Sequence, residues 1–551
     1  MAQWRHRLIE PVIVLLITLF TGLASQRWAG LDTPDSSFYA SLGIFGDEVS
    51  DRAPENSYYW TRLGVIVPRL VLTDVAGTWP GLALHRMLLL LLLVTGVYVT
   101  LRRFTGVPTA AFLATITSLS TVVLSYLGNP FPTATVLAGT SIVIACAMLD
   151  GRRSAAVAGA TLGWLAMSNP PGVLLAGTVW LVLRLQARTR LGPILVAVGA
   201  AAVTFAGFWL VGRRVFPRMD WLGAYLESNA RLDYSVFASK DAVWLGDVSL
   251  VVPASVLVAC VLAWWMRREQ VAAQRALVIS SSSIAFLLVF TPMFGGIPLE
   301  APMYQAMLWP PALIALALVA TLALPAGRWT WPQAGAGAVG VVVVIAAGFT
   351  APGLGLGAGW LLAAGLVTAF LVLPRLGPIA AIAGVAILLA GAQLLQNSRG
   401  DLGLYYLSPY RWAFSANPIS ERIQAAVNTQ EWLLASTTDS DRILLWVGGD
   451  WAGGDRELYV VAGMQLWGEN RVTLAPTMDA DGLARLAAAR PSVVAMYAPT
   501  IGAIDAFWAS LPRELSPTSP DCYDFAWAPN PASAYQVTHG HACLTRITWE
   551  G

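Results

Sequence analysis

The feature that most constrains this chain is a series of apolar runs between residues 8 and 395, each about 20 residues long. A helix of that length matches the roughly 30 Å hydrocarbon core of a bilayer. Apolar residues make up 56% of the 551 residues and charged residues only 12%, about half the charged share of a soluble globular domain. A single soluble core cannot hold these runs, so the chain is predicted to cross a membrane many times.

The runs predict about thirteen spans, which form a polytopic α-helical domain over residues 1–398. Residues 1–25 have a basic start and an apolar stretch, which suit either a cleaved signal peptide or a first span, and the span count favours the span. The predicted spans are 8–26, 81–101, 107–127, 132–149, 154–168, 171–187, 192–212, 248–266, 274–294, 304–325, 333–351, 357–374 and 377–395.

The arginine clusters predict the topology. With a cytoplasmic N-terminus, nearly every cluster next to a span lies inside, as the positive-inside rule requires. The same parity places loops 27–80 and 213–247 and the C-terminal part outside, so we expect a multi-pass cell-membrane protein with a cytoplasmic N-terminus. The inner clusters are Arg102-Arg103, Arg152-Arg153, Arg188 with Arg190, Arg267-Arg268, Arg328 and Arg375, and the exception is Arg213-Arg214.

Residues 399–551 differ from the rest of the chain, because charge density rises and short apolar runs alternate with Gly, Pro, Asp and Ser. This composition predicts a soluble extracytoplasmic α/β domain. The stretch LLWVGGDWAGGD lacks the glycine spacing of a phosphate-binding loop, so we interpret it as an ordinary loop. The predicted strands and helices are RILLWV, LARLAAAR, SVVAMY and AIDAFWASL.

The four cysteines divide into two pairs. Cys522 and Cys543 lie 21 residues apart in the C-terminal part and could form a disulfide if that part faces an oxidising compartment. Cys146 and Cys260 lie inside apolar runs. Neither pair has metal-ligand spacing, and the four histidines do not complete a site, so no metal or other cofactor is expected.

The first outer loop gathers acidic, aromatic and basic residues close to the membrane surface. Moving a sugar from a polyprenyl phosphate to a hydroxyl needs a base for the acceptor proton, and a carboxylate can provide it. It also needs donors that stabilise the departing phosphate. Asp35, or Asp32 beside it, suits the first task. The candidates for the second are Tyr58, Tyr59, Arg62 and Arg69.

The segment Asp35-Ser-Ser-Phe-Tyr39 has a tyrosine four residues after an aspartate, just beyond the first predicted span. This arrangement resembles the GT-C superfamily of integral-membrane glycosyltransferases, near the protein mannosyltransferase and aminoarabinose transferase branch. The following stretch, SYYWTRLGVIVPRL, resembles the juxtamembrane helix of that superfamily. Ser36 replaces a second carboxylate that is often present there, which leaves open whether Asp32 takes its place.

The resemblance implies a polyprenyl-phosphate-sugar-dependent glycosyltransferase with a GT-C-like membrane domain. It implies inverting transfer from a polyprenyl-monophosphate sugar to a cell-envelope glycan, lipid or protein at the outer face, with Asp35 as general base. The partners would be this donor, the acceptor and the lipid bilayer, with no nucleic acid. Some members of the superfamily need a divalent metal, but the few candidate ligands here favour transfer without one.

Four residues beyond the first loop are further candidates for the substrate cleft, and each candidate also has an ordinary structural interpretation. Aspartates cap helices and form turns, interfacial tyrosines form aromatic belts, and arginines extend along apolar surface to reach lipid phosphates. His85 and Arg86, at the start of the second span, face either a cavity or the interface. The further candidates are Arg231, Lys240, Glu300 and Tyr304.

Two other functions remain open. A ligase or polymerase of lipid-linked glycans would also have many spans and a large outer loop, and we would expect its essential outer residues to include Arg and His. A transporter would have charged or helix-breaking residues near the midplane and paired repeats. The sequence shows no internal repeat.

Overall fold

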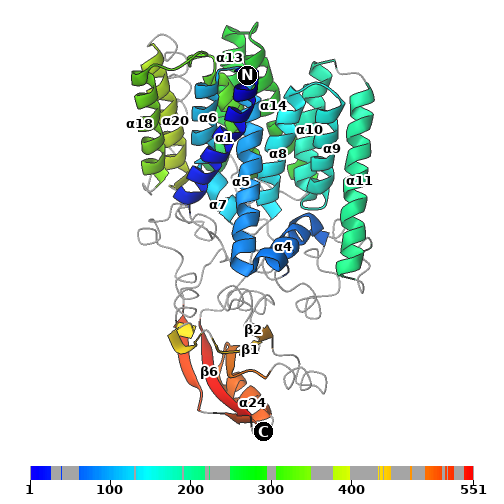
Figure 1. Cartoon of the computed structure of the whole chain (residues 1–551), viewed down its shortest axis with the longest axis vertical. Coiled ribbons are helices and arrows are strands. Elements are labelled where there is room, and N and C mark those ends of the chain that lie inside the picture. Colours follow the sequence, from blue (N-terminus) through cyan, green and yellow to red (C-terminus); the bar gives the residue numbers. More distant parts are fainter. Residues whose placement is uncertain are drawn as a thin grey trace. The chain divides into compact units, whose positions relative to one another are not determined.

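The structure is a computed structural model of the whole chain (Figure 1), and it divides into two compact units that are described separately. One unit comprises 1–29, 55–67 and 83–417, and the other comprises 30–54, 68–82 and 418–551. The residues described are 2–25, 39, 42, 61–128, 132–188, 191–216, 223, 248–293, 306–348, 377–397, 432–433, 435–438, 440–447, 472–474, 490–511, 515–517, 519–526 and 539–549. The predicted domain boundary at 398 lies outside them and stays a prediction.

The helical part follows the predicted spans closely. Each predicted span overlaps with helix except 357–374, which lies outside the described residues, and 107–127 overlaps with two separate helices. The helices are α1 (Ala2–Ala24), α4 (Leu63–Ala76), α5 (Thr78–Arg102), α6 (Val107–Ser118), α7 (Thr121–Gly128), α8 (Pro132–Met148), α9 (Arg152–Ala166), α10 (Pro170–Gln186), α11 (Leu191–Val215), α13 (Val248–Met266), α14 (Val271–Met293), η4 (Ala306–Leu308), α17 (Trp309–Ala320), α18 (Trp331–Gly348) and α20 (Pro378–Asn397).

The prediction of one continuous span over 107–127 is wrong, because the helix ends at Ser118 and α7 begins at Thr121. The last turn of α6 tightens, since the Ser120 amide donates to the Thr117 carbonyl at 3.2 Å. The Ser118 hydroxyl donates to the Thr115 carbonyl at 2.9 Å. A serine side chain that bonds nearby backbone competes with the helical ladder, and here this bond accompanies the end of α6.

Three of the described helices are long and apolar enough to cross a membrane, namely Pro80–Arg102, Leu191–Val215 and Val271–Val289. Seven shorter apolar helices accompany them among the described residues. Large apolar side chains of α11 are exposed, for example Leu195 at 60% and Val203 at 74%. So much exposed apolar surface on one helix is unfavourable in water and favourable in lipid.

Several contacts bring helix ends together at one end of the bundle, which we call the basic end. Arg102 of α5 forms an ion pair with Glu10 of α1 at 3.2 Å. The Thr109 hydroxyl of α6 donates to the Pro325 carbonyl after α17. Arg184, in the last turn of α10, donates to the Cys146 carbonyl near the end of α8 at 2.8 Å.

The paired arginines at the end of α5, the start of α9 and the end of α13 therefore share the basic end. Arg213-Arg214 of α11 lie at the opposite end, where α11 approaches Leu63 of α4. This grouping is the one that the positive-inside pattern predicted, whichever side of the membrane the basic end faces.

Small residues allow α9 and α11 to pack closely. A Cβ atom added to Gly159 would lie 2.0 Å from the Ala197 carbonyl oxygen, and one added to Gly163 would lie 2.4 Å from that of Ala201. Glycines four residues apart remove one stripe of side chains, so the two backbones meet directly, as membrane helices commonly do. α11 lies beside α9 at the edge of the helices (Figure 1).

The C-terminal part contains a mixed sheet. The strands are β1 (Ile443–Val447), β2 (Val472–Leu474), β3 (Val493–Ala498), β4 (Leu515–Pro517), β5 (Asp521–Ala526) and β6 (His539–Trp549). Their order is β2-β1-β3-β6-β4, and β5 pairs with β6 beside β4. β1 runs parallel to β2 and β3, whereas β6 runs antiparallel to β3.

The strands predicted at RILLWV and SVVAMY coincide with β1 and β3, and AIDAFWASL coincides with α24 (Ile501–Ser510). LARLAAAR lies outside the described residues except for Arg490. Ile504 and Phe507 of α24 pack with Val494 and Met496 of β3 in one core. β3 is buried on both faces, which explains why its sequence is a continuous apolar run.

Cys522 of β5 and Cys543 of β6 are directly opposite in the antiparallel register and form a disulfide. The bond closes a loop with a sequence separation of 21 residues. In the same register, the Asp524 carboxylate contacts the His541 imidazole at 2.6 Å. Both pairs fix the position of β5 at the edge of the sheet.

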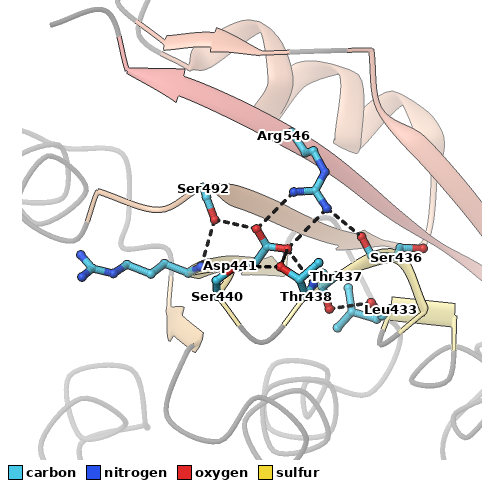
Figure 2. A network of polar contacts seen from close by, with 9 residues as sticks. Leu433, Ser436, Thr437, Thr438, Ser440, Asp441, Ser492 and Arg546 are labelled. Atoms are coloured by element: carbon cyan, nitrogen blue, oxygen red, sulfur yellow. Dashed lines mark hydrogen bonds and ion pairs between the residues drawn. The ribbon is translucent and has the colours of Figure 1, made fainter.

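A buried aspartate joins three strands of this sheet (Figure 2). Asp441 precedes β1 and accepts hydrogen bonds from the Thr438 amide at 2.7 Å and the Ser492 hydroxyl at 3.1 Å. Arg546 of β6 approaches the same carboxylate with both terminal nitrogens, at 3.1 and 3.4 Å. Burial alone would raise the pKa of Asp441, but these hydrogen bonds outweigh it and hold the pKa below the usual value.

Candidate functional site

The candidate site centres on α4, a helix that buries its charged side chains and exposes apolar ones. Arg62, just before α4, lies with Arg69 and Thr73 on one face, because spacings of seven and four residues return to the same side of a helix. All three are buried, at 6%, 2% and 8% exposure. On the other side, Val71 and Val75 are 56% and 80% exposed. The helix therefore turns its cationic face inward and its apolar face outward.

A proline explains how the start of α4 is held. Pro68 has no amide hydrogen, so the Gly64 carbonyl four residues earlier has no helical donor. The indole Nε1 of Trp164 in α9 donates to that carbonyl at 2.8 Å. The Gly64 amide in turn donates to the Met167 carbonyl at 2.9 Å. A side chain at position 64 would clash with Ser168, since an added Cβ would lie 2.2 Å from its hydroxyl oxygen.

A tight elbow at Gly77 ends α4 and starts α5. Gly77 has φ +86°, which favours glycine. A Cβ atom at Gly81 would lie 2.5 Å from the Leu72 carbonyl oxygen, so only glycine allows the first turn of α5 to approach α4 so closely. The direction of the cationic face is thus set at both ends of the helix.

Arg69 connects α4 with the acidic motif of the first outer loop. Its Nη1 donates a long hydrogen bond, 3.4 Å, to the Tyr39 carbonyl oxygen, and Tyr39 is fully buried. Burial lowers the pKa of Arg69 to about 9, partly opposed by Tyr39, so the guanidinium remains charged at neutral pH. The last residue of the Asp35–Tyr39 motif therefore lies beside a buried cation.

The second span contributes two more buried ionisable side chains. His85 and Arg86 of α5 are 5% and 6% exposed. The sequence left open whether they face a cavity or the interface, and both side chains are buried against the protein. Arg86 Nη2 donates to the Ser25 hydroxyl, at the end of α1.

Of the predicted substrate-binding residues, the structure describes Tyr39, Arg62 and Arg69. It brings Tyr39 to Arg69 and places Arg62 on the same face of α4 as Arg69. The other candidates lie outside the described residues, and their roles stay predictions. They are Asp32, Asp35, Tyr58, Tyr59, Arg231, Lys240, Glu300 and Tyr304.

Metal-binding side chains are not gathered in the described part of the chain, where no three His, Cys, Asp or Glu residues lie close enough to hold an ion.

Sequence reasoning missed two features that hold the start of α4 in place. A proline inside a predicted helix could have indicated that the Gly64 carbonyl needs a donor from elsewhere. The donor itself, Trp164, is 100 residues away and has no local signal.

By sequence, no protein-family profile and no curated protein matches the chain. By structure, it is similar to ArnT from Cupriavidus metallidurans bound to undecaprenyl phosphate, with 14% identity, 98% of each chain covered and a TM-score of 0.48. It is also similar to the arabinofuranosyltransferase AftD from Mycobacteria, with 14% identity, 96% of this chain and 39% of that chain covered, and a TM-score of 0.45.

A third similar structure is the oligosaccharyltransferase of Archaeoglobus fulgidus in the apo form, with 13% identity and a TM-score of 0.38 over 82% of this chain and 63% of that one. Likenesses this distant assign no activity. What this chain does must be inferred from its own residues.

Proposed function

We propose that this protein transfers a sugar from a polyprenyl-monophosphate donor to a cell-envelope glycan, lipid or protein at the extracytoplasmic face of the membrane. The observation that supports this proposal is the buried cationic face of α4, with Arg62 and Arg69 turned away from an exposed apolar face. A helix with this polarity suits a membrane surface where lipid meets one side and a charged head group the other.

The two arginines can stabilise the negative charge that develops on the departing phosphate. In the donor, the phosphate is a diester with one negative charge, and it leaves as a monoester that carries up to two. A preorganised guanidinium stabilises charge that develops in the transition state, and its planar fork suits phosphate oxygens. Arg62 and Arg69 are proposed for this role, with the Tyr58 and Tyr59 hydroxyls as further donors.

Asp35 is proposed as the general base. The acceptor oxygen attacks the anomeric carbon, the bond from that carbon to the phosphate oxygen breaks, and the acceptor proton passes to the Asp35 carboxylate. A single displacement inverts the anomeric centre. The contact between Arg69 and Tyr39 supports this assignment, since it ties the motif that contains Asp35 to α4. Arg231, Lys240, Glu300 and Tyr304 are proposed to line the same cleft.

The test is a transfer assay in membranes with a panel of polyprenyl-phosphate sugars. We expect Asp35→Asn to lower the transfer rate about 100-fold or more, the usual contribution of a general base. Arg69→Gln should lower it similarly, since a preorganised charge contact is worth about 10²–10³. Asp74→Asn is the matched control, because Asp74 is an exposed charge on the same helix.

The outcomes separate the parts of the proposal. Full activity in both Asp35→Asn and Asp32→Asn would show that neither carboxylate is the base. Equal losses in Arg69→Gln and Asp74→Asn would show that the cationic face has no special role. If the wild type transferred no sugar, the result would favour the alternative that the protein is a transporter.

A further inference from the structure

Arg86 is a buried cation with unusually little compensation. It lies in α5 at the end of the bundle opposite the basic end, and 6% of the side chain is exposed. Its Nη2 donates to the Ser25 hydroxyl. Within the described part of the chain, Nε of Arg86 has no hydrogen-bond partner, and no carboxylate pairs with the guanidinium.

The surroundings fix the guanidinium in place. Gly22 of α1 faces Met87, and an added Cβ there would lie 2.5 Å from the Met87 sulfur, so α1 and α5 are in close contact beside Arg86. Ser25 is held by its own hydrogen bond to the Gly22 carbonyl at 3.3 Å. The Thr21 hydroxyl bonds Ser118 of α6 at 3.1 Å. The Ser25 hydroxyl that Arg86 contacts is neutral and does not balance its charge.

A second buried arginine differs from Arg86 in having a carboxylate partner within the described part of the chain. Arg184, 1% exposed, donates to the carbonyls of Cys146 and Leu149 and pairs with the Asp150 carboxylate at 3.4 Å. Nε of Arg184 has no hydrogen-bond partner either, but a carboxylate and two carbonyls face its charge. Burying a charge without such partners is costly, so a buried arginine among hydroxyls needs an anion from elsewhere.

We propose that Arg86 and Ser25 bind the phosphate group of an anionic lipid at this end of α1 and α5. A guanidinium offers paired N–H donors that suit phosphate oxygens, and the serine hydroxyl adds one more. Arg86 lies within the first two turns of the span Pro80–Arg102, and the ends of a span are the parts nearest to lipid head groups. The inference rests on the proposed function only for the first probe below, a polyprenyl phosphate.

The experiment is a thermal-shift titration of the purified full-length protein in detergent. The probes are undecaprenyl phosphate, phosphatidylglycerol and inorganic phosphate, with undecaprenol as the probe that lacks phosphate. We expect at least one phosphate probe to stabilise the wild type and to bind Arg86→Gln about tenfold more weakly, the loss of one charge-assisted contact. The control Arg275→Gln removes an arginine that caps α10 through the Leu183 carbonyl at the basic end and should bind like the wild type.

The probe whose affinity depends on Arg86 identifies the source of the phosphate. If Arg86→Gln bound every phosphate probe as tightly as the wild type, the inference would be overturned. If that variant did not yield folded protein, Arg86→Lys decides. A single ammonium cannot reproduce the fork, so the proposal requires weaker phosphate binding, whereas unchanged binding in Arg86→Lys would contradict it.

These results are independent of transfer. If Asp35→Asn abolished transfer but phosphate binding did not depend on Arg86, only the present inference would fail. If phosphate binding depended on Arg86 but no sugar were ever transferred, the lipid-phosphate site would stand without the proposed function.

Discussion

Asp441 and Arg86 illustrate two ways in which this chain buries a charged side chain. The Asp441 carboxylate accepts five hydrogen bonds, from Thr438, Ser492 and Arg546. Arg86 donates to one hydroxyl. A fully satisfied buried charge stabilises a particular arrangement of strands, whereas an incompletely satisfied one carries a desolvation cost that a bound anion would offset.

Asp441 gives the C-terminal sheet a dependence on acid. Because its pKa is lower in the folded state than in the unfolded chain, its contribution to stability is complete above the unfolded pKa of about 4 and is lost as pH falls through the folded pKa. We expect the free energy of unfolding of this part to decrease below about pH 4. Thermal unfolding of the full-length protein between pH 6 and 3, followed by tryptophan fluorescence, would measure it.

The variant Asp441→Asn tests the cause of that acid dependence. It keeps the size of the side chain but removes the charge that Arg546 and Ser492 bind, so we expect a loss of about 1–3 kcal/mol at pH 7 and a flatter acid profile. Asp505→Asn, in α24, is the control because Asp505 is an exposed carboxylate. An acid profile in Asp441→Asn as steep as that of the wild type would assign the effect to other groups.

At the scale of elements, the packing of α9 against α11 depends on glycine rather than on large side chains. Gly159 and Gly163 meet the carbonyls of Ala197 and Ala201 directly. Without a hydrophobic driving force between helices in lipid, such close van der Waals packing and the contacts it permits are what hold two helices together.

Replacing Gly159 with alanine should therefore destabilise the helix pair, although alanine is the better helix former. A Cβ atom at this position would lie 2.0 Å from the Ala197 carbonyl oxygen, so the backbones must separate. We expect a cost of about 1–3 kcal/mol, seen as a lower thermal-unfolding midpoint in detergent. Gly199→Ala is the matched control, because nothing lies within 4 Å of its added Cβ. Equal midpoints for the two variants would contradict the packing argument.

The helices show which features could be predicted from the sequence and which could not. Bilayer thickness fixes the length of an apolar run, so most helices were found within a few residues. The break after Ser118 was missed because serine and threonine hardly lower the hydropathy of a long run. Arg62 and Arg69 were identified as candidates from their place in the first loop. Their burial depends on which face of α4 meets the protein, and only the three-dimensional arrangement reveals that.

Contacts between residues far apart in the sequence could not be predicted, for a related reason. Arg546 and Asp441 are 105 residues apart, and the sequence around each of them gives no sign that the two side chains meet. The strands β1 and β3 were recognisable as apolar runs, but the antiparallel strand β6 that joins them to β5 was not predicted. Its sequence, from His539 to Trp549, mixes polar and apolar residues without strict alternation, so it gives no clear strand signal.

At the scale of the whole molecule, the basic end sets the expected orientation. The positive-inside rule predicts that this end faces the cytoplasm, and the predicted topology then has the start of the chain inside and the C-terminal part outside. The disulfide between Cys522 and Cys543 fits an oxidising compartment on the outer side.

We expect alkaline phosphatase fused after the last residue to be active, since that enzyme matures only outside the cytoplasm. In the unfused protein, Cys522 and Cys543 should react with a thiol reagent only after reduction, whereas Cys146 and Cys260 are buried and should stay protected until unfolding. The control is the same fusion placed after Arg103, at the basic end, which should be inactive. Activity of the second fusion alone would reverse the assigned orientation.

The glycine contacts of α11 also make it sensitive to the thickness of the membrane. With 25 residues from Leu191 to Val215, the helix is about 37 Å long, longer than the roughly 30 Å of hydrocarbon, and tilting is one way to match the two lengths. A smooth glycine surface on α9 lets α11 change its tilt without displacing side chains. Gly212 of α11 touches Leu63 at the start of α4. A change of tilt would move this contact, so bilayers of different acyl length should alter the packing at the start of α4.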